Sequence, residues 1–333
     1  MHVVITMPFP ASILEKIESS FAGVTVEQVA LKDKQWPDDR LTMAEVIYGL
    51  TGFPAEAQSP ALRWIQMHSA GVDHLRDTAV WSRNIQLTSA SGIHASNIAQ
   101  YVLTQMLTWA NRVPTWVRLQ TAAQWPQNRW ETFLPQELYG KTLGILGYGS
   151  IGREVARLAK AFNMQLLVTK RDARHIKDNG YFLPGLGDPE GNLPHRIYPS
   201  EATRSMVAEC DFVVITLPLT AQTHHLFDEA MFKAMPAYSY LINVGRGGII
   251  NESCLVKALK KGWIAGAGLD VFESEPLPQN SPLWKMENVT LTPHISGFTP
   301  AYDERATDLF VENLRRYQSD EPLLNLVNRD SGY

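Results

Sequence analysis

The feature that most constrains the fold is an alternation of short apolar runs with helix-like stretches along most of the chain. Each run is closed by Gly, Pro, Ser or Asp, as expected for buried strands that end in turns. Strands joined through helices must run parallel, because a parallel pair needs a crossover connection. The pattern therefore predicts parallel sheets covered by helices. In the first hundred residues we expect strands at Val3–Thr6, Val24–Leu31, Val46–Leu50, Leu62–Met67 and Ile85–Leu87.

A second series of strands and helices begins at Lys141, after a long helix predicted from Ser96 to about Leu119. The run Asp172–Pro199 interrupts this series with four glycines, four prolines and no apolar period, which is typical of a functional or interface loop. We expect helices at Ile151–Phe162 and Tyr302–Tyr317, and strands at Leu143–Leu146, Gln165–Thr169, Phe212–Leu217, Leu241–Val244, Ala265–Leu269 and Val289–Leu291.

Composition sets the limits for this fold. At roughly 150 residues per domain, 333 residues suggest about two domains, and 45% hydrophobic with 19% charged residues is an ordinary globular balance. A net charge of −4 disfavours general binding to nucleic acid or to an anionic membrane. The only cysteines are Cys210 and Cys254, no apolar run approaches the roughly 18 residues of a membrane span, and Pro8 ends the first run too early for a signal peptide. We therefore expect a soluble, cytoplasmic protein without a nucleic-acid or membrane partner.

A glycine fingerprint follows the strand predicted at Leu143–Leu146. The segment Gly147-Tyr148-Gly149-Ser150-Ile151-Gly152 has the spacing G-x-G-x-x-G and opens a predicted helix. In this context the first glycine allows a tight turn, the second lets a pyrophosphate approach the backbone, and the third lets the helix pack on the strand. Unpaired N–H groups at the start of the helix attract the phosphates. The segment therefore predicts a dinucleotide site.

The end of the next strand indicates which dinucleotide binds. An NAD site usually carries Asp or Glu there, which accepts hydrogen bonds from the ribose hydroxyls. This chain has Lys170 at that position, with Arg171 and Arg174 close by. Such cations would bind a ribose phosphate, which a carboxylate would repel. We therefore predict NADP as the preferred cofactor; the alternative is NAD, with Asp172 as the ribose ligand and the cations solvated.

Four further motifs each follow a predicted strand, where open α/β sheets bind their ligands. They are Asn243–Gly248, Gly268–Phe272, Glu275–Pro278 and Thr292–Gly297. Together with Ser69-Ala70-Gly71-Val72-Asp73 upstream, the set resembles the D-isomer-specific 2-hydroxyacid dehydrogenase family over nearly the whole chain. The stretch Ser281–Trp284 is most similar to the glyoxylate/hydroxypyruvate reductases of that family.

The residue types in these motifs suit the reduction of a 2-keto acid. That reaction needs a cation for the carboxylate and carbonyl oxygens and a proton donor for the new alkoxide. Arg246 offers a planar, permanently charged guanidinium, and His294 can exchange a proton near neutral pH. Glu275, hydrogen-bonded to the other imidazole nitrogen, would favour the protonated ring and fix its orientation. We predict these three residues as the catalytic set.

The resemblance implies the same three roles and adds binding residues. It implies that Asp270 contacts the nicotinamide amide and that the backbone around Ala70 and Gly71 holds the substrate carboxylate, together with Arg246 and His294. Further cofactor contacts are implied at Leu217, Pro218, Thr223, Val244, Gly245 and Gly297.

The resemblance also implies the architecture: two doubly wound parallel-sheet domains with the active site in the cleft between them. A Rossmann-type dinucleotide-binding domain, residues 99–298, would be inserted into a flavodoxin-like substrate domain formed by residues 1–98 and 299–333. A homodimer is implied, with the helix near residues 96–119 as the candidate interface. The linking helix carries Ala99-Gln100-Tyr101 where members of the family often have Ala-Glu-His, which we interpret as packing or interface variation.

The expected activity is NADP-linked reduction of glyoxylate, hydroxypyruvate or a similar small 2-keto acid to the D-2-hydroxy acid by hydride transfer. Alternatives are a phosphite dehydrogenase, which shares the Arg–Glu–His set, and an NAD(H)-sensing corepressor that acts by binding partners. A formate dehydrogenase would carry Gln in place of Glu275. We expect His68 to line a pocket wall, and we predict no metal site because the histidines lack suitably spaced partners.

Overall fold

The structure is a computed structural model that describes residues 1–31 and 41–332. The chain divides into two compact units. Unit 1 comprises Met1–Ile93, Asn179–Leu183 and Thr299–Tyr333, and unit 2 comprises His94–Asp178 and Pro184–Phe298. The first division therefore lies at Ile93 where residue 98 was expected, and a short piece of the Asp172–Pro199 run groups with unit 1.

Unit 1 is built on a parallel sheet of five strands. The strands are β1 (His2–Ile5), β2 (Thr25–Gln28), β3 (Val46–Gly49), β4 (Trp64–Met67) and β5 (Gln86–Thr88), and the helices are α1 (Ala11–Ser19), α2 (Ala79–Ser82) and α10 (Tyr302–Gln318). Their order, β2-β1-β3-β4-β5, is flavodoxin-like. Alternate residues face opposite sides of the sheet, so that Val4 and Ile47 belong to one core, while Val3 and Tyr48 pack with α1 and α10.

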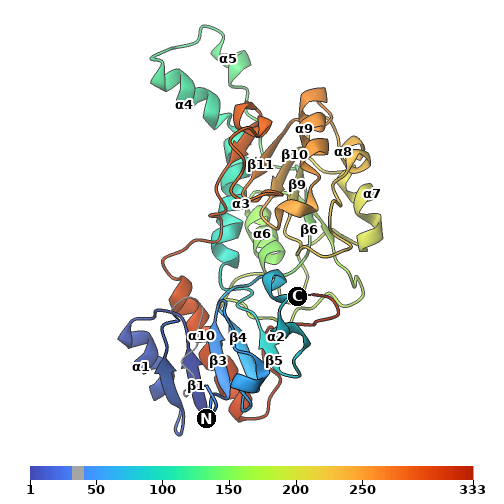
Figure 1. The fold of residues 1–333 in the computed structure, drawn as a ribbon. Helices are drawn as coiled ribbons and strands as arrows, with labels where there is room; N and C mark the ends of the chain where they lie inside the picture. Colours follow the sequence, from blue (N-terminus) through green and yellow to red (C-terminus); the bar gives the residue numbers. More distant parts are fainter. Residues whose placement is uncertain (32–40, 333) are drawn as a thin grey trace. The chain divides into compact units, whose positions relative to one another are not determined.

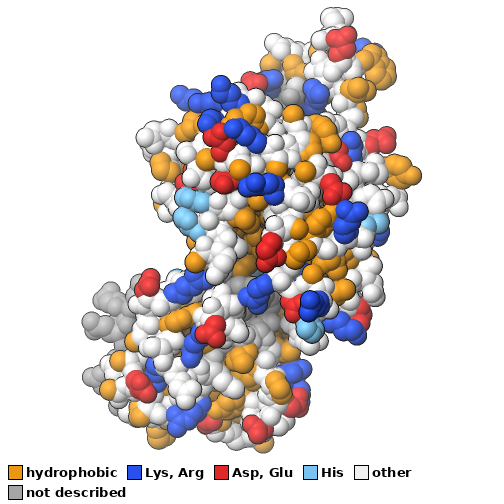
Figure 2. All heavy atoms as spheres, turned by 90° about the vertical axis from the view of Figure 1, so that its right-hand side faces the viewer, with side chains coloured by type: hydrophobic (Ala, Val, Ile, Leu, Met, Phe, Trp, Pro, Cys, Tyr) orange, Lys and Arg blue, Asp and Glu red, His pale blue; other side chains and the backbone are white. Residues whose placement is uncertain are grey.

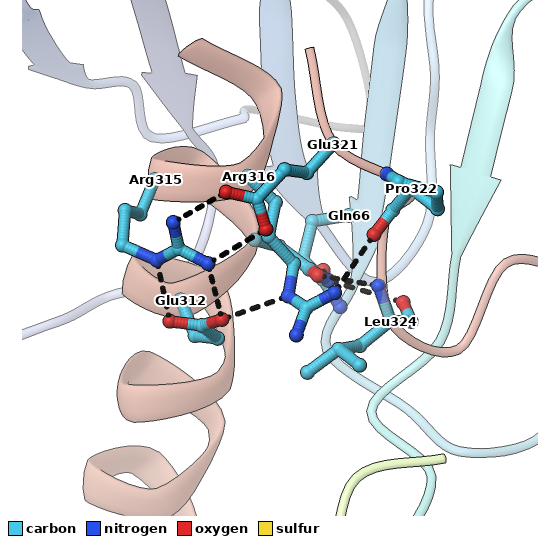
Figure 3. A network of polar contacts seen from close by, with 8 residues as sticks. Gln66, Glu312, Arg315, Arg316, Glu321, Pro322 and Leu324 are labelled. Atoms are coloured by element: carbon cyan, nitrogen blue, oxygen red, sulfur yellow. Dashed lines mark hydrogen bonds and ion pairs between the residues drawn. The ribbon is translucent and has the colours of Figure 1, made fainter. Parts of the chain in front are cut away.

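In unit 1, a network of polar contacts connects the end of α10 with the segment that follows it and with β4 (Figure 3). Arg315 pairs with Glu312 at 3.0 Å and with Glu321 at 2.8 Å, which ties the helix to the segment that follows it. The amide of the buried Asn313 donates a hydrogen bond of 3.2 Å to Gln66 Oε1 in β4. Helix α10 and the segment that follows it are thereby attached to β4, the neighbour of the edge strand β5.

Unit 2 is built on a parallel sheet of seven strands. The strands are β6 (Thr142–Leu146), β7 (Gln165–Thr169), β8 (Arg196–Tyr198), β9 (Phe212–Ile215), β10 (Tyr240–Asn243), β11 (Gly266–Leu269) and β12 (Val289–Leu291). The helices are α3 (Ala95–Ala110), α4 (Val113–Thr121), α5 (Arg129–Thr132), α6 (Ser150–Ala161), α7 (Thr203–Val207), α8 (Glu229–Ala234) and α9 (Glu252–Lys261). Short 3-10 turns complete the two units at Glu56–Gln58, Asp73–Leu75, Ser200–Ala202, Gly247–Ile249 and Pro282–Lys285.

The strand order in unit 2 is β12-β11-β10-β9-β6-β7-β8. Counted from β6, this is the Rossmann order with one added strand at the β12 edge. Helices α3 and α6 pack on one face against Leu143 and Ile145, and α7, α8 and α9 cover the other face (Figure 1). The predicted fold class, two parallel α/β sheets with a Rossmann-type unit, is confirmed.

Two predictions about elements were wrong. The helix expected to run to Leu119 ends at Ala110, because Arg112 adopts a left-handed conformation (φ 53°) and Pro114 stands in the first turn of the separate helix α4. The irregular run to Pro199 ends in a strand, β8, which pairs with β7. That pairing joins segments far apart in the sequence, and a local apolar pattern cannot show it.

The surface carries no strong segregation of charge on the face drawn in Figure 2, where Lys and Arg side chains are interspersed with Asp and Glu. None of the helices in residues 1–31 and 41–332 combines the length and apolar character needed to cross a lipid bilayer.

Candidate active site

Strand register places the predicted site residues of unit 2 along one edge of its sheet. The last residues of β6, β9, β10, β11 and β12 are paired side by side: Leu146 with Ile215, Asn243 with Ile215 and Leu269, and Leu269 with Leu291. The residues that follow them therefore begin neighbouring loops. This row of loops contains the glycine fingerprint and all four motifs predicted to carry the chemistry.

The glycine turn between β6 and α6 fits a dinucleotide. Gly147 has φ of 97°, a conformation that favours glycine. A Cβ on Gly149 would meet no atom within 4 Å, so the backbone at the start of α6 can be approached closely. A Cβ on Gly152 would lie 2.2 Å from the Gly147 carbonyl oxygen, so only glycine lets α6 begin this close to the strand. Ser150 and Ile151 form the first turn of the helix, where backbone N–H groups can bind phosphate.

The predicted cations follow β7. Lys170 is half-buried, whereas Arg171 and Arg174 are exposed. Burial, followed by the charge of Arg153, lowers the pKa of the Lys170 ammonium, so an anion bound beside it would be favoured. The Asp172 carboxylate already accepts hydrogen bonds from the Arg174 backbone N–H at 3.0 Å and from His175 Nδ1 at 2.5 Å.

The loops after β9 and β10 touch each other. Thr223 Oγ1 donates a hydrogen bond of 2.7 Å to the Pro218 carbonyl and so closes the first of these loops. A Cβ on Gly245 would lie 2.7 Å from the Leu217 carbonyl oxygen, and one on Gly147 would lie 3.1 Å from the Leu217 side chain. The glycines thus let three strand ends approach one another.

Arg246 is held at the end of β10 by a buried asparagine. Asn243 Oδ1 accepts the Gly245 N–H at 3.1 Å, and its amide donates to the Arg246 carbonyl at 3.1 Å. The guanidinium Nη1 donates to the Gly245 carbonyl at 2.9 Å. A Cβ on Gly247 would collide with the backbone of Phe272 at 1.9 Å, so the turn that carries Arg246 is pressed against the next loop.

His294 and Glu275 form the predicted pair. His294 Nδ1 lies 2.8 Å from Glu275 Oε2, and Glu275 Oε1 accepts the Phe272 N–H at 3.0 Å, so both carboxylate oxygens are used. With Nδ1 bonded to the carboxylate, Nε2 is the imidazole nitrogen that can exchange a proton with a substrate. His294 has φ of 55°, a left-handed conformation that is costly for a side chain other than glycine and is often found at functional sites.

Asp270 organises the loop that carries His294. Its fully buried carboxylate accepts the N–H of Ile295 at 2.9 Å, the N–H of Ser296 at 2.9 Å and the hydroxyl of Thr292 at 2.6 Å. The Asp270 carbonyl also accepts the His294 N–H at 2.9 Å. Val244 and Gly297, the remaining predicted cofactor residues, lie at the starts and ends of these same loops.

The predicted substrate loop belongs to unit 1, where it follows β4. Ser69 Oγ donates a hydrogen bond of 2.8 Å to the Gly71 carbonyl, which folds the loop back over Ala70. His68, expected in a pocket wall, is buried between Tyr48 Oη, at 2.9 Å from Nδ1, and Asp303, at 3.3 Å from Nε2. Burial lowers the pKa of His68.

The sequence model of the family "D-isomer specific 2-hydroxyacid dehydrogenase, NAD binding domain" matches residues 103–296. A glyoxylate reductase of Korarchaeum cryptofilum (strain OPF8) is 32% identical over 335 residues, which cover 99% of this chain and 96% of that protein. The chain belongs to the D-isomer specific 2-hydroxyacid dehydrogenase family. The resemblance of its motifs is thereby confirmed, and the protein is an NAD(P)-dependent oxidoreductase of 2-hydroxy acids and 2-keto acids.

Solved structures agree with this membership. A D-isomer specific 2-hydroxyacid dehydrogenase from Xanthobacter autotrophicus Py2, in complex with NADPH and MES, has a TM-score of 0.81 and 27% identity and covers 100% of this chain and 99% of its own. An NADPH-dependent glyoxylate/hydroxypyruvate reductase from Sinorhizobium meliloti, in complex with NADP and sulfate, has a TM-score of 0.79 at 25% identity, with 100% and 99% covered. A nicotinamide dinucleotide is the cofactor of the dehydrogenase.

Sequence reasoning missed a buried cation beside the glycine fingerprint of the dehydrogenase. Arg153 in α6 is fully buried, donates to the carbonyls of Ile176 and Asp188, and lies 4.5 Å from the Tyr148 ring centre. Tyr148 Oη donates to Asp188 Oδ2 at 2.6 Å. The Asp172–Pro199 run is thus folded around the first turn of α6, and no local sequence signal marked Arg153, which shares its side of the helix with Arg157 and Lys160.

Among the side chains that the structure describes, no group of three or more His, Cys, Asp or Glu residues is arranged to hold a metal ion.

Substitutions at two glycines of the fingerprint should affect different properties: the stability of the fold at Gly152 and the affinity for the cofactor at Gly149. Gly152→Ala places a methyl group against the Gly147 carbonyl and should lower the stability of the dehydrogenase by about 1–3 kcal/mol, as overpacking does. Gly149→Ala enters open space and should leave the melting temperature unchanged, while weakening dinucleotide binding. Thermal unfolding and dinucleotide titration measure the two effects. Unchanged affinity in Gly149→Ala would contradict the placement of the pyrophosphate.

Proposed function

We propose that this protein is an NADP-linked reductase of a small 2-keto acid, such as glyoxylate or hydroxypyruvate, and that it forms the D-2-hydroxy acid. The observation that carries this proposal is the 2.8 Å contact between His294 and Glu275 on the same sheet edge as Arg246 and the glycine turn. The similar enzymes of Korarchaeum and Sinorhizobium, a glyoxylate reductase and a glyoxylate/hydroxypyruvate reductase, agree with this substrate class.

Arg246, His294 and Glu275 have different roles in the proposed reaction. The Arg246 guanidinium binds the carboxylate and the carbonyl oxygen and polarises the carbonyl bond. When bound, the reduced dinucleotide supplies the hydride that reduces the carbonyl carbon. His294 gives its Nε2 proton to the carbonyl oxygen, so that the keto group becomes a hydroxyl, and Glu275 stabilises the imidazole in the orientation that allows this transfer. Ala70 and Gly71 hold the substrate carboxylate through backbone N–H groups.

The preference for NADP rests on the residues after β7. Lys170 is half-buried beside the charge of Arg153, and Arg171 and Arg174 add cations on the same loop. Asp172, the carboxylate closest in sequence to these cations, is already bonded to His175. Charge-assisted hydrogen bonds to a ribose phosphate are favoured in such surroundings. The similar Xanthobacter and Sinorhizobium structures hold NADPH and NADP.

We assign unit 2 as the dinucleotide-binding domain and unit 1 as the substrate domain. The match to the NAD-binding family model, residues 103–296, supports the first assignment. We also propose a homodimer formed through the arm, defined here as residues 113–134, which projects from the sheet of unit 2 (Figure 1). The arm exposes 80% of Trp125 and 78% of Trp130, an apolar surface suited to a second copy of the same arm.

Removal of the proton donor tests the mechanism. His294→Gln should lower kcat by about 10²–10⁴-fold, the usual contribution of general acid catalysis. Glu275→Gln should lower it by a smaller factor, because the imidazole loses its ionic partner but keeps a hydrogen-bond acceptor. Steady-state reduction of glyoxylate and hydroxypyruvate measures both. His225→Gln is the matched control, since His225 pairs with Glu273 at 2.5 Å and also has a positive φ of 51°. Near-normal turnover in His294→Gln would refute the assignment.

Cofactor preference is tested by the Lys170→Ala variant. We expect the wild-type protein to have a higher kcat/KM with NADPH than with NADH, and Lys170→Ala to lower that ratio about tenfold or more, because a charge-assisted hydrogen bond is lost. Lys177→Ala is the control, since Lys177 is an exposed cation paired with Glu190 in the same run. A wild-type preference for NADH would overturn the proposal.

The dimer is tested at the arm. Replacement of both Trp125 and Trp130 by Ser should convert a dimer into a monomer in light scattering, because the exposed apolar area is lost. Tyr238→Ser, which alters an exposed aromatic residue outside the arm, should leave the mass unchanged. An equal mass for the wild-type protein and the double variant would rule out this interface.

A further inference from the structure

A chain of hydrogen bonds runs from helix α3 to the carboxylate of Asp270. Gln105 Nε2 donates to Tyr101 Oη at 2.7 Å, and Tyr101 Oη lies 2.6 Å from Thr292 Oγ1. The Thr292 hydroxyl donates to Asp270 Oδ1 at 2.6 Å. At the other end, the Thr290 hydroxyl donates to Gln105 Oε1. The chain therefore links two side chains of α3 to two hydroxyls of β12 and its loop.

The direction of each hydrogen bond follows from the number of protons available. Asp270, as a carboxylate, only accepts, so the single Thr292 proton points to it. Thr292 must then accept from Tyr101, whose own oxygen accepts from the Gln105 amide. In the same way, the Thr290 hydroxyl donates its proton to Gln105 Oε1 and accepts a hydrogen bond from Tyr240 Oη, which lies at 3.0 Å. Every donor points toward Asp270, and bonds aligned in this way strengthen one another.

Because Gly268 in β11 has no side chain, the sheet leaves room for this chain of hydrogen bonds. A Cβ on Gly268 in β11 would lie 2.9 Å from Gln105 Oε1 and 3.0 Å from Tyr240 Oη, so a side chain there would displace both groups. The Trp109 ring stacks on the Tyr240 ring with centres 4.7 Å apart, which holds the far end of the chain. Burial raises the pKa of Tyr101, so its phenol stays protonated as a donor at neutral pH.

We propose that Tyr101 is a positioning residue for the nicotinamide end of the cofactor site, acting through Thr292 on Asp270. This inference rests on the proposed contact of Asp270 with the nicotinamide amide. Tyr101 stands where the linking helix departs from the family pattern Ala-Glu-His, and the contacts give that departure a role other than packing. Because Asp270 also holds the N–H groups of Ile295 and Ser296, a shift of its carboxylate would move the loop that carries His294.

Tyr101→Phe removes one oxygen from the middle of the chain and tests the inference by binding. The ligands are the reduced dinucleotide that the wild-type protein binds more tightly and the matching compound without nicotinamide, ADP-ribose for NADH or its 2′-phosphate for NADPH. We expect binding of the dinucleotide to weaken about fivefold, the effect of losing one ordinary hydrogen bond, with unchanged binding of the ADP-ribose compound. Thr292→Val should behave like Tyr101→Phe, and Thr292→Ser, which keeps the hydroxyl, should restore wild-type affinity.

Tyr317→Phe is the matched control, since Tyr317 Oη donates a hydrogen bond of 3.1 Å to Glu45 in unit 1. It should lower the melting temperature about as much as Tyr101→Phe and leave both affinities unchanged. Equal weakening of both ligands in Tyr101→Phe, or no weakening of either, would overturn the inference. A wild-type protein that binds the dinucleotide but reduces no 2-keto acid would instead refute the proposed function, and the binding ratio would still decide the role of Tyr101.

Discussion

Parallel pairing of five strands in unit 2 is the constraint on which the site depends. In a parallel sheet the carboxyl ends of neighbouring strands lie at one edge, and here the register aligns their last residues as well. Gly147, Thr216, Val244, Asp270 and Thr292 therefore follow neighbouring strand ends, although the chain between the first and the last spans most of unit 2. A shift of one strand by one residue would reverse the faces of its side chains and separate the row. The apolar core thus sets the positions from which the polar loops begin.

The loops themselves are held by polar groups as well as by apolar packing, in which Ile249 and Phe272 take part. Asn243 binds two backbone groups of the turn that carries Arg246, and Asp270 binds two backbone N–H groups of the loop that carries His294. A buried polar group that lacked these partners would be costly, so each arrangement is strongly preferred over its alternatives. Glu275 does the same for the Phe272 N–H and directs its second oxygen to the imidazole. The loops that carry Arg246 and His294 are consequently held in place by polar groups of the protein itself.

The sequence alone predicted every described strand of the two sheets except β8. Strand ends, the glycine fingerprint and the four motifs follow local rules of spacing, and their positions in the structure agree with those rules. The break of the long helix has a local signal in Pro114, but the strand Arg196–Tyr198 and the buried Arg153 could not be predicted in this way. Each depends on partners distant in the sequence: a strand pairs with another, and a buried guanidinium needs the carbonyls of a remote loop. The role proposed for Tyr101 could not be predicted either, because it depends on the contact of Tyr101 with Thr292 and of Thr292 with Asp270, both of which are distant from Tyr101 in the sequence.

The distribution of charge explains how a chain with a net charge of −4 can bind anions. The negative groups on the sheet edge are each engaged by donors: Asp270 by two N–H groups and a hydroxyl, and Glu275 by an N–H group and an imidazole. Donors that surround a carboxylate reduce its repulsion of a nearby anion. The cations on the same edge, Lys170 and Arg246, follow strands on either side of the glycine turn. We therefore expect a phosphate and a carboxylate to be attracted to different strand ends, because the local field at each end, and not the total charge, acts on a nearby anion.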